Sequence, residues 1–319
     1  EEEGHWQLEH CISNGINFVD TAEMYPTNPL RRDTAGETEQ IIGNWFRKRK
    51  RRDDIIVATK VTGEGSKTVR DGSPISKSTI KVALEGSLKR LNSDYIDLYQ
   101  LHWPNRGSYH FRQNWNFDPT KQVKSEVTEN IFEILSYLSA QVKEGKIRTI
   151  GLSNESAWGT MQFINAATEN GFEKIVSIQN EYSLLCRYFD TDLAELCHNE
   201  NMHLLAYSPL AAGLLTGKYQ NDNVPKNSRL QFSPGLNGRI NERSLNAVSR
   251  YLTIAKKFQL NPVNMALAFC AQKPFMGSVI FGSTRNEQLQ TIIDGLDLEL
   301  SQEILTELNM VHREYPFPI

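Results

Sequence analysis

The chain has 319 residues, of which 39% are hydrophobic and 23% are charged. This composition can bury a sizeable core, which excludes an intrinsically disordered chain. The 35 Lys and Arg residues nearly balance the 38 Asp and Glu residues. A nucleic-acid-binding domain usually carries a basic excess, and a membrane span needs roughly 18 consecutive apolar residues, so neither nucleic acid nor a membrane is expected as a partner.

Cysteine usage indicates a reducing compartment. The cysteines form no C-x-x-C motif, and none lies among histidines at metal-ligand spacing, so no metal site is expected. No apolar signal segment opens the given sequence, and we expect a cytoplasmic enzyme. The four cysteines are Cys11, Cys186, Cys197 and Cys270.

Short apolar runs alternate with longer amphipathic stretches along the chain. The opening stretch, residues 2–14, is predicted to be a helix, and the basic run at residues 47–52 a solvated helix end. The length and β-branched content of the short runs predict buried strands. These strands are expected at residues 16–19, 55–59, 95–101, 147–151, 175–179, 203–207 and 277–281.

Several of the stretches between these runs carry apolar residues at helical spacing. Ser78 and Asn261 are the expected N-cap residues of two helices, and Pro262 follows Asn261 at the first helical position. The helices are expected around residues 81–88, 131–142, 190–197 and 263–271.

The alternation of strands and helices predicts an α/β fold with a parallel sheet. Seven strands are one short of the eight in a (β/α)₈ TIM barrel. We therefore expect a single barrel domain over residues 1–319, with its first strand belonging before Glu1. A doubly wound open sheet is the alternative, but the G-x-G-x-x-G motif that usually follows its first strand does not occur.

Polar side chains that follow the first three strands suggest proton chemistry. In a barrel, the active site lies at the C-terminal ends of the strands, where Asp20, Tyr25, Lys60 and His102 are expected. A tyrosine has an ordinary pKa of about 10, and a neighbouring lysine lowers it. Asp20 can keep a buried Lys60 charged, and His102 can hydrogen-bond the oxygen that Tyr25 protonates. Each residue alone could be structural, but together they are complementary.

Three segments carry a family resemblance. Residues 15–25, GINFVDTAEMY, are similar to the aldo-keto reductase signature in which a strand ends in D-[ST]-A-x-x-Y. Residues 98–104 and 145–154 also resemble that family, and the match covers nearly the whole chain. The resemblance implies a (β/α)₈ barrel and NADPH-dependent reduction of an aldehyde or ketone to an alcohol. It also implies that Tyr25 donates the proton, that Lys60 and Asp20 adjust the pKa of Tyr25, and that His102 orients the carbonyl.

The resemblance further implies a set of NADP(H)-binding residues. Arg285 would favour NADP over NAD, whereas Thr291 and Ile292 replace the Glu-Asn pair that the family often places near the adenine. The nicotinamide carboxamide would be held by Ser153, Asn154 and Gln179, with Tyr207 stacked on the ring. The phosphates would be held by Ser208, Pro209, Leu210, Gly213, Lys218 and Arg229, and the adenosine end by Gly282, Thr284, Arg285 and Gln288.

The substrate pocket and two other functions remain open at this stage. The aromatic residues of segment 103–120 could form one wall of an apolar pocket or pack on one another. A resemblance to potassium-channel β subunits permits an NADP(H)-binding redox sensor with little turnover. A lyase using Lys60 as a Schiff base is a further alternative, but Asp20 opposes it because such a lysine must be neutral. A small-molecule carbonyl substrate is the expected partner; neither its identity nor an oligomeric state follows from the sequence.

Overall fold

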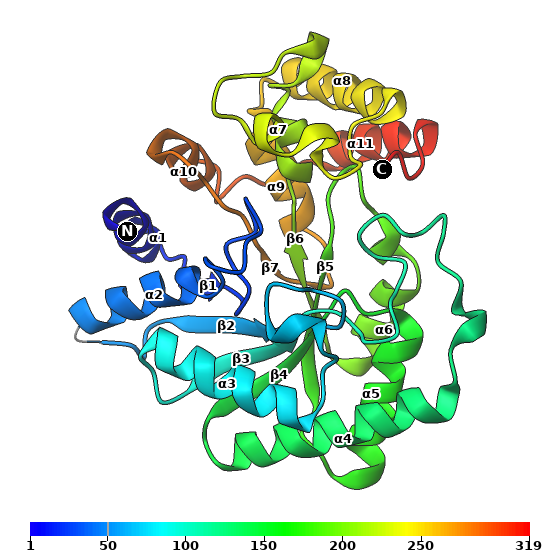
Figure 1. Ribbon diagram of the computed structural model, residues 1–319. Coiled ribbons are helices and arrows are strands. Elements are labelled where there is room, and N and C mark those ends of the chain that lie inside the picture. The colour runs from blue at the N-terminus through cyan, green and yellow to red at the C-terminus, as the bar shows by residue number, and fades with distance from the viewer. Residues whose placement is uncertain (50) are drawn as a thin grey trace. The chain divides into compact units, whose positions relative to one another are not determined.

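The computed structural model describes residues 1–49 and 51–319, so Lys50 of the basic run lies outside the described residues. The chain separates into two compact units, Glu1–Ile178 and Gln179–Ile319. Among the described residues there are seven strands, and their order in the sheet follows the chain from β1 to β7 (Figure 1). The predicted α/β class and all seven predicted strands are confirmed.

The first unit is built on parallel strands with helices between them. Strand neighbours β1 to β4 are paired in parallel, with Asp20 opposite Ala58 and Lys60 opposite Gln100. The C-terminal ends of these strands therefore lie along one edge of the sheet. The strands are β1 Phe18–Asp20, β2 Ile56–Val61, β3 Ile96–Leu101 and β4 Ile147–Ser153. The helices are α1 Glu2–Ser13, α2 Glu37–Lys48, α3 Lys77–Leu91, α4 Lys124–Lys143 and α5 Ala157–Asn170.

Strand β5, Ile175–Glu181, runs from the first unit into the second. The second unit also contains the parallel pair β6, His203–Tyr207, and β7, Met276–Val279. Its helices are α6 Asp192–Glu200, α7 Arg229–Phe232, α8 Glu242–Lys257, α9 Pro262–Ala271, α10 Asn286–Ile293 and α11 Gln302–Glu314.

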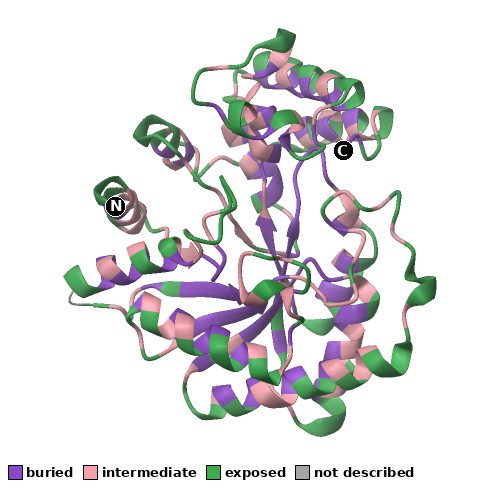
Figure 2. Cartoon of the chain, in the orientation of Figure 1, coloured by how far each residue is buried: buried purple, intermediate pink, exposed green. Residues whose placement is uncertain are grey.

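Burial explains why these segments form the first unit. Strands β2, β3 and β4 are buried along most of their length, whereas α2, α3 and α4 alternate buried and exposed residues (Figure 2). The close approach of α2 and α3 depends on Gly43, because a Cβ there would lie 2.0 Å from the carbonyl oxygen of Arg90. Each of these helices thus buries one apolar face, as an amphipathic pattern requires.

The helix boundaries confirm most expectations and correct one. Helix α1 covers the predicted opening helix, and Asn261 caps α9 by accepting a 2.9 Å hydrogen bond from the Val263 amide. The prediction of Ser78 as an N-cap is wrong. Ser76 caps α3 instead, because its hydroxyl accepts from the Thr79 amide at 3.3 Å while the Thr79 hydroxyl accepts from the Ser76 amide at 2.8 Å. This reciprocal capping box satisfies two otherwise unpaired backbone donors.

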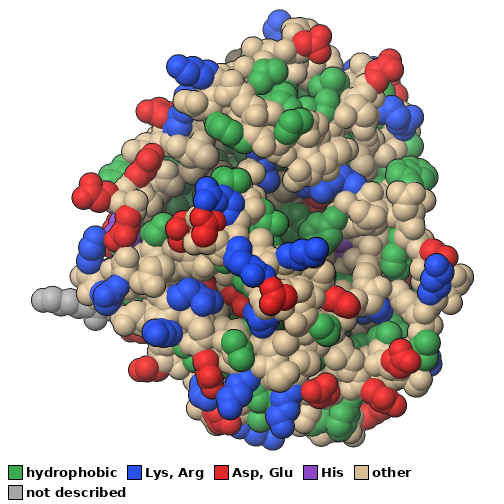
Figure 3. Space-filling view, viewed as in Figure 1, with side chains coloured by type: hydrophobic (Ala, Val, Ile, Leu, Met, Phe, Trp, Pro, Cys, Tyr) green, Lys and Arg blue, Asp and Glu red, His purple; other side chains and the backbone are tan. Residues whose placement is uncertain are grey.

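The surface carries mixed charge. On the face shown in Figure 3, Lys and Arg side chains are interspersed with Asp and Glu side chains. Helix α2 ends at Lys48 with Arg47 and Lys48 in its last turn, so the predicted basic helix end is confirmed for these residues. Within the described residues, no helix is both long enough and apolar enough to cross a membrane.

Candidate active site

A buried ion pair joins the ends of β1 and β2. The Nζ atom of Lys60 lies 2.6 Å from Oδ2 of Asp20 and donates a 2.8 Å hydrogen bond to the carbonyl oxygen of Thr21. The Lys60 side chain is fully buried, and that of Asp20 is 8% exposed. Gln100 on β3 donates from Nε2 to the other carboxylate oxygen of Asp20 at 3.3 Å. The carboxylate is therefore held from two adjacent strands.

Tyr25 and His102 lie beside this pair. Lys60 Nζ is 5.0 Å from the centroid of the Tyr25 ring, and the Tyr25 carbonyl accepts a 3.0 Å hydrogen bond from the Gly36 amide. His102 follows β3, and its ring meets that of Tyr25 edge-on with centroids 5.6 Å apart. The structure thus brings together the four residues predicted for proton chemistry. Tyr25 is half-buried, whereas His102 is buried.

Burial decides the protonation of Tyr25. It raises the pKa of Tyr25 above the ordinary value, and the positive charge of Lys60 offsets only part of this rise. Lys60 acts in the predicted direction, but the net shift is upward, contrary to the sequence-based expectation of a lowered pKa. Burial would lower the pKa of Lys60, yet its interactions with Asp20 and Tyr25 outweigh burial and raise it. Tyr25 is therefore a phenol and Lys60 an ammonium at neutral pH.

His102 is neutral in this setting. Burial, together with the charge of Lys60, holds the pKa of His102 well below its ordinary value. Among the described residues, Nδ1 of His102 has no hydrogen-bond partner. A neutral imidazole carries one N–H and one acceptor nitrogen, so His102 can donate a single hydrogen bond to a substrate oxygen.

A second buried ion pair fixes the turn that carries Tyr25, and the sequence did not reveal it. Glu23 accepts a 2.6 Å hydrogen bond from the Thr62 amide and pairs with the guanidinium of Arg70 through both oxygens. Arg70 also donates to the Thr62 carbonyl at 3.2 Å. Glu23 is 4% exposed, so this network locks the segment after β1 onto the end of β2.

Ser153 and Asn154 lie directly beside His102. Asn154 donates from Nδ2 to the His102 carbonyl at 2.9 Å and to the Ser153 hydroxyl at 3.0 Å. Both side chains are buried, and Asn154 has a left-handed backbone with φ of 52°. The first unit therefore places two of the predicted carboxamide-binding residues against the catalytic candidates. Gln179 begins the second unit and is 3% exposed.

The segment after β6, which carries the predicted phosphate-binding residues, is a tight irregular loop. Tyr207 ends β6 and is half-buried, and the backbone then has positive φ at Ser208, Ala211, Ala212 and Gly213. Within it, the amides of Ala211 and Gly213 donate to the carbonyl oxygens of Ser208 and Leu210 at 2.8 and 2.9 Å. A Cβ at Gly213, where φ is 94°, would lie 2.9 Å from Cε and 3.0 Å from Nζ of Lys218, so this cation lies close to the loop backbone. Gly213 and Lys218, two of the predicted phosphate-binding residues, therefore lie against one another.

The residues predicted to hold the adenosine end, Gly282, Thr284, Arg285 and Gln288, are exposed. Gln288 accepts from the amide of Thr284 at 3.0 Å and from its hydroxyl at 3.2 Å, and Arg285 occupies the N-cap position of α10. Ile292 is 4% exposed and packs into the core, so it offers no polar contact. The remaining residues are Pro209, which is buried, Leu210, which is half-buried, and Arg229 and Gly282, which are exposed.

The aromatic residues of segment 103–120 pack on one another. Trp103 meets Phe111 edge-on with centroids 6.0 Å apart, and Tyr109 meets Phe117 in the same way at 6.4 Å. Trp115 is 81% exposed. Trp103 is also anchored by a 3.0 Å hydrogen bond from Nε1 to the Glu64 carbonyl. Self-packing is therefore observed for four of these aromatic residues, and one of them, Trp103, also lines a cavity of the first unit.

Comparisons with known proteins identify the family of the chain. Residues 3–313 match the family described as the Aldo/keto reductase family. The chain is 40% identical to Protein tas of Escherichia coli (strain K12), over 100% of this chain and 91% of that protein. It is 35% identical to an aldo-keto reductase of Babesia bovis, over 83% and 98% respectively. It is 28% identical to a probable voltage-gated potassium channel subunit beta of Oryza sativa subsp. japonica, over 97% and 87%.

Proposed function

The chain belongs to the aldo/keto reductase family and is an oxidoreductase of that family, and from this premise we propose that it reduces an aldehyde or ketone to an alcohol with NADPH. The observation that carries the proposal is the fully buried Lys60, paired with Asp20 beside Tyr25 and His102. A buried cation with its carboxylate is costly to maintain. The position of this ion pair next to the protonated Tyr25 supports a role in proton transfer.

The proposed roles follow from the protonation states. A bound reduced nicotinamide supplies the hydride. His102, which is neutral, donates one hydrogen bond to the substrate oxygen and orients it. Tyr25 then gives its phenolic proton to that oxygen, and Lys60 stabilises the phenolate that remains. Asp20 keeps Lys60 charged, and solvent returns a proton to Tyr25 before the next turnover.

The cofactor proposal rests on the donor set of each unit. Ser153 and Asn154 supply side-chain donors and acceptors for a carboxamide, and the loop around Gly213 with Lys218 suits a pyrophosphate. Arg285 is proposed to select NADP(H) over NAD(H) by pairing with the extra phosphate. We also propose a single (β/α)₈ barrel domain over residues 1–319, because the described residues contain seven strands in chain order with intervening helices.

Two measurements test the proposal. Fluorescence titration with NADPH and NADH should show tighter binding of NADPH, and Arg285→Ala should reduce that preference. Oxidation of NADPH with a panel of aldehydes and ketones should yield the alcohol. NADPH binding without turnover on any carbonyl would refute the reductase and favour a redox sensor, the second candidate, which the similarity to the Oryza channel subunit supports.

A further inference from the structure

A cavity of about 230 Å³ lies in the first unit, between the helix-facing side of β3 and β4 and helices α4 and α5. Leu101, Leu152, Ile131 and Phe163 contribute one apolar residue from each of these four elements. None of Asp20, Tyr25, Lys60 and His102 lines it. Successive residues of a strand point to opposite faces, so Leu101 faces this cavity and His102 faces away from it. The cavity therefore contains none of the four catalytic candidates, although Ser153, a predicted carboxamide-binding residue, also lines it.

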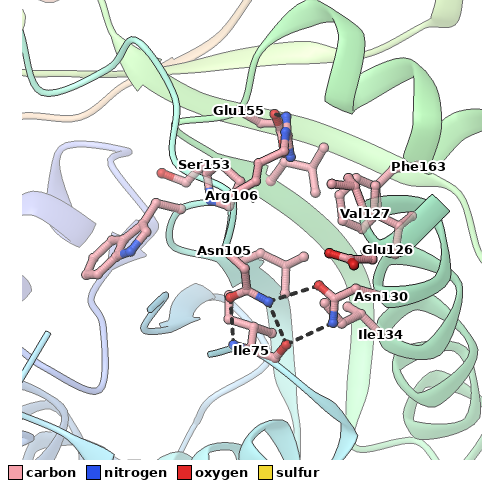
Figure 4. Close-up of a pocket in the computed structure, with 15 residues that line it drawn as sticks. Ile75, Asn105, Arg106, Glu126, Val127, Asn130, Ile134, Ser153, Glu155 and Phe163 are labelled. Atoms are coloured by element: carbon pink, nitrogen blue, oxygen red, sulfur yellow. Dashed lines mark hydrogen bonds and ion pairs between the residues drawn. The ribbon is translucent and has the colours of Figure 1, made fainter. Parts of the chain in front are cut away.

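Two amide side chains close one wall. The Oδ1 atom of Asn105 accepts from the Ile75 amide at 2.7 Å, and its Nδ2 donates to the Ile75 carbonyl at 2.8 Å and to Asn130 Oδ1 at 2.9 Å. Asn130 donates from its own Nδ2 to the Ile75 carbonyl at 3.2 Å. Figure 4 shows this network at the side of the cavity. Because these amides already have partners, they shape the wall without requiring a ligand.

A buried ion pair forms another part of the lining. Arg106 donates from Nη1 to Oε2 of Glu155 at 2.9 Å, and Glu155 also accepts a 2.6 Å hydrogen bond from the Ser156 amide. The two side chains are 9% and 4% exposed, and their charges cancel. This pair therefore adds no net charge to the cavity.

Glu126 is the remaining charged residue of the lining. It lies in the first turn of α4, and in Figure 4 its side chain extends from that helix toward the cavity. Glu126 is exposed, and among the described residues its carboxylate has no hydrogen bond or ion pair, so it faces solvent at the rim. The lining as a whole therefore combines apolar walls with one net negative charge at the edge, and a complementary ligand carries one positive charge.

We propose that this cavity binds a small organic cation, in which an ammonium group is attached to a compact aromatic or alicyclic body. The body occupies the space between Leu101, Leu152 and Phe163, where burial of apolar surface favours it. The ammonium group pairs with Glu126 and stays in contact with water, so it avoids the full cost of desolvation. This inference does not depend on the proposed carbonyl reduction.

Calorimetric titration of the full chain with benzylammonium chloride tests the site, with benzyl alcohol as a neutral probe of similar shape. Wild type should bind one benzylammonium saturably and more tightly than benzyl alcohol. Glu126→Gln should weaken benzylammonium binding about fivefold and remove the preference for the cation. Glu129→Gln is the matched control, because Glu129 is exposed on the same helix but does not line the cavity.

A cavity-filling variant provides the second criterion. Val127 lines the cavity at a half-exposed position, so Val127→Trp should fill the space without disturbing the fold, which circular dichroism can check. Both probes should then lose measurable binding. The proposal is overturned by absence of saturable binding to wild type, by equal affinities of Glu126→Gln and Glu129→Gln, or by undiminished binding to a folded Val127→Trp. None of these outcomes bears on NADPH oxidation, so the two proposals fail independently.

Discussion

Replacing Asp20 with Asn removes the partner of a fully buried ammonium group. In the native protein, Lys60 has the Asp20 carboxylate at 2.6 Å and the Thr21 carbonyl at 2.8 Å. The variant keeps the carbonyl contact but leaves the charge uncompensated. Removal of one partner of a buried ion pair typically costs about 3–5 kcal/mol. We therefore expect the free energy of unfolding to fall by about this amount at pH 7.

The loss of the carboxylate should also change how the free energy of unfolding depends on pH. In the native protein the pKa of Lys60 is raised, so its stabilising contribution is complete below the unfolded-state pKa and is lost as pH rises through the folded-state pKa. In Asp20→Asn, burial without a carboxylate lowers the folded-state pKa of Lys60 below the unfolded value. The unfolded state then binds more protons than the folded state. The stability of the variant relative to wild type should consequently recover as pH rises toward the unfolded-state pKa.

Urea denaturation between pH 7 and pH 10 measures this recovery. Asp97→Asn is the matched control, because the Asp97 side chain is also 8% exposed but pairs with Arg52 and Arg148, at 2.7 and 2.8 Å. Arginine does not lose its proton in this range, so the control should be destabilised without an alkaline recovery. Parallel pH profiles for the two variants would refute the assignment of a charged Lys60 held by Asp20.

Three further outcomes follow from the site. Tyr25→Phe should lower the turnover number by about 10²- to 10⁴-fold while NADPH titration shows unchanged affinity; retained turnover would exclude Tyr25 as the proton donor. The rate of reduction should not change between pH 6 and pH 8, because the pKa of His102 is well below its ordinary value and the pKa of Tyr25 is raised. An inflection of the rate near pH 6.5 would contradict a neutral His102. Gly151→Ala should lower stability by about 1–3 kcal/mol in urea titrations, since its Cβ would lie 2.8 Å from Oγ of Ser177; unchanged stability would show that the site relaxes freely.

The strands of this fold could be predicted because their signal is local. Each is a short apolar run, and every predicted run contains most of a strand. Capping was harder, because Ser76, Ser78 and Thr79 all carry hydroxyl groups near the start of α3. Ser76 is the cap because it forms a reciprocal pair of hydrogen bonds with Thr79. This pair depends on the residue at which the backbone enters the helix.

The contacts that orient the candidate site could not be predicted in the same way. Glu23 and Arg70 are 47 residues apart, and Arg70 lies in a turn where its backbone φ is 46°. Sequence reasoning has no signal for a pairing between two loops, since either residue alone reads as a solvated charge. The net rise in the pKa of Tyr25 was missed for a related reason. The charge of Lys60 is visible in the sequence, but the burial that outweighs it is a property of the packed structure.

Strand periodicity would have separated the buried polar groups of β3 into two sets. Asp97 and Tyr99 have one parity, and the Asp97 carboxylate accepts from the Val57 amide and pairs with Arg52, away from Lys60. Gln100 and His102 have the other parity, and they face Asp20 and Tyr25. Because successive side chains of a strand point to opposite faces, the face of His102, which directly follows β3, indicates the face of every second residue before it. Gln100 therefore follows as a positioning residue for Asp20 once His102 is accepted, although composition and motif gave no reason to select it.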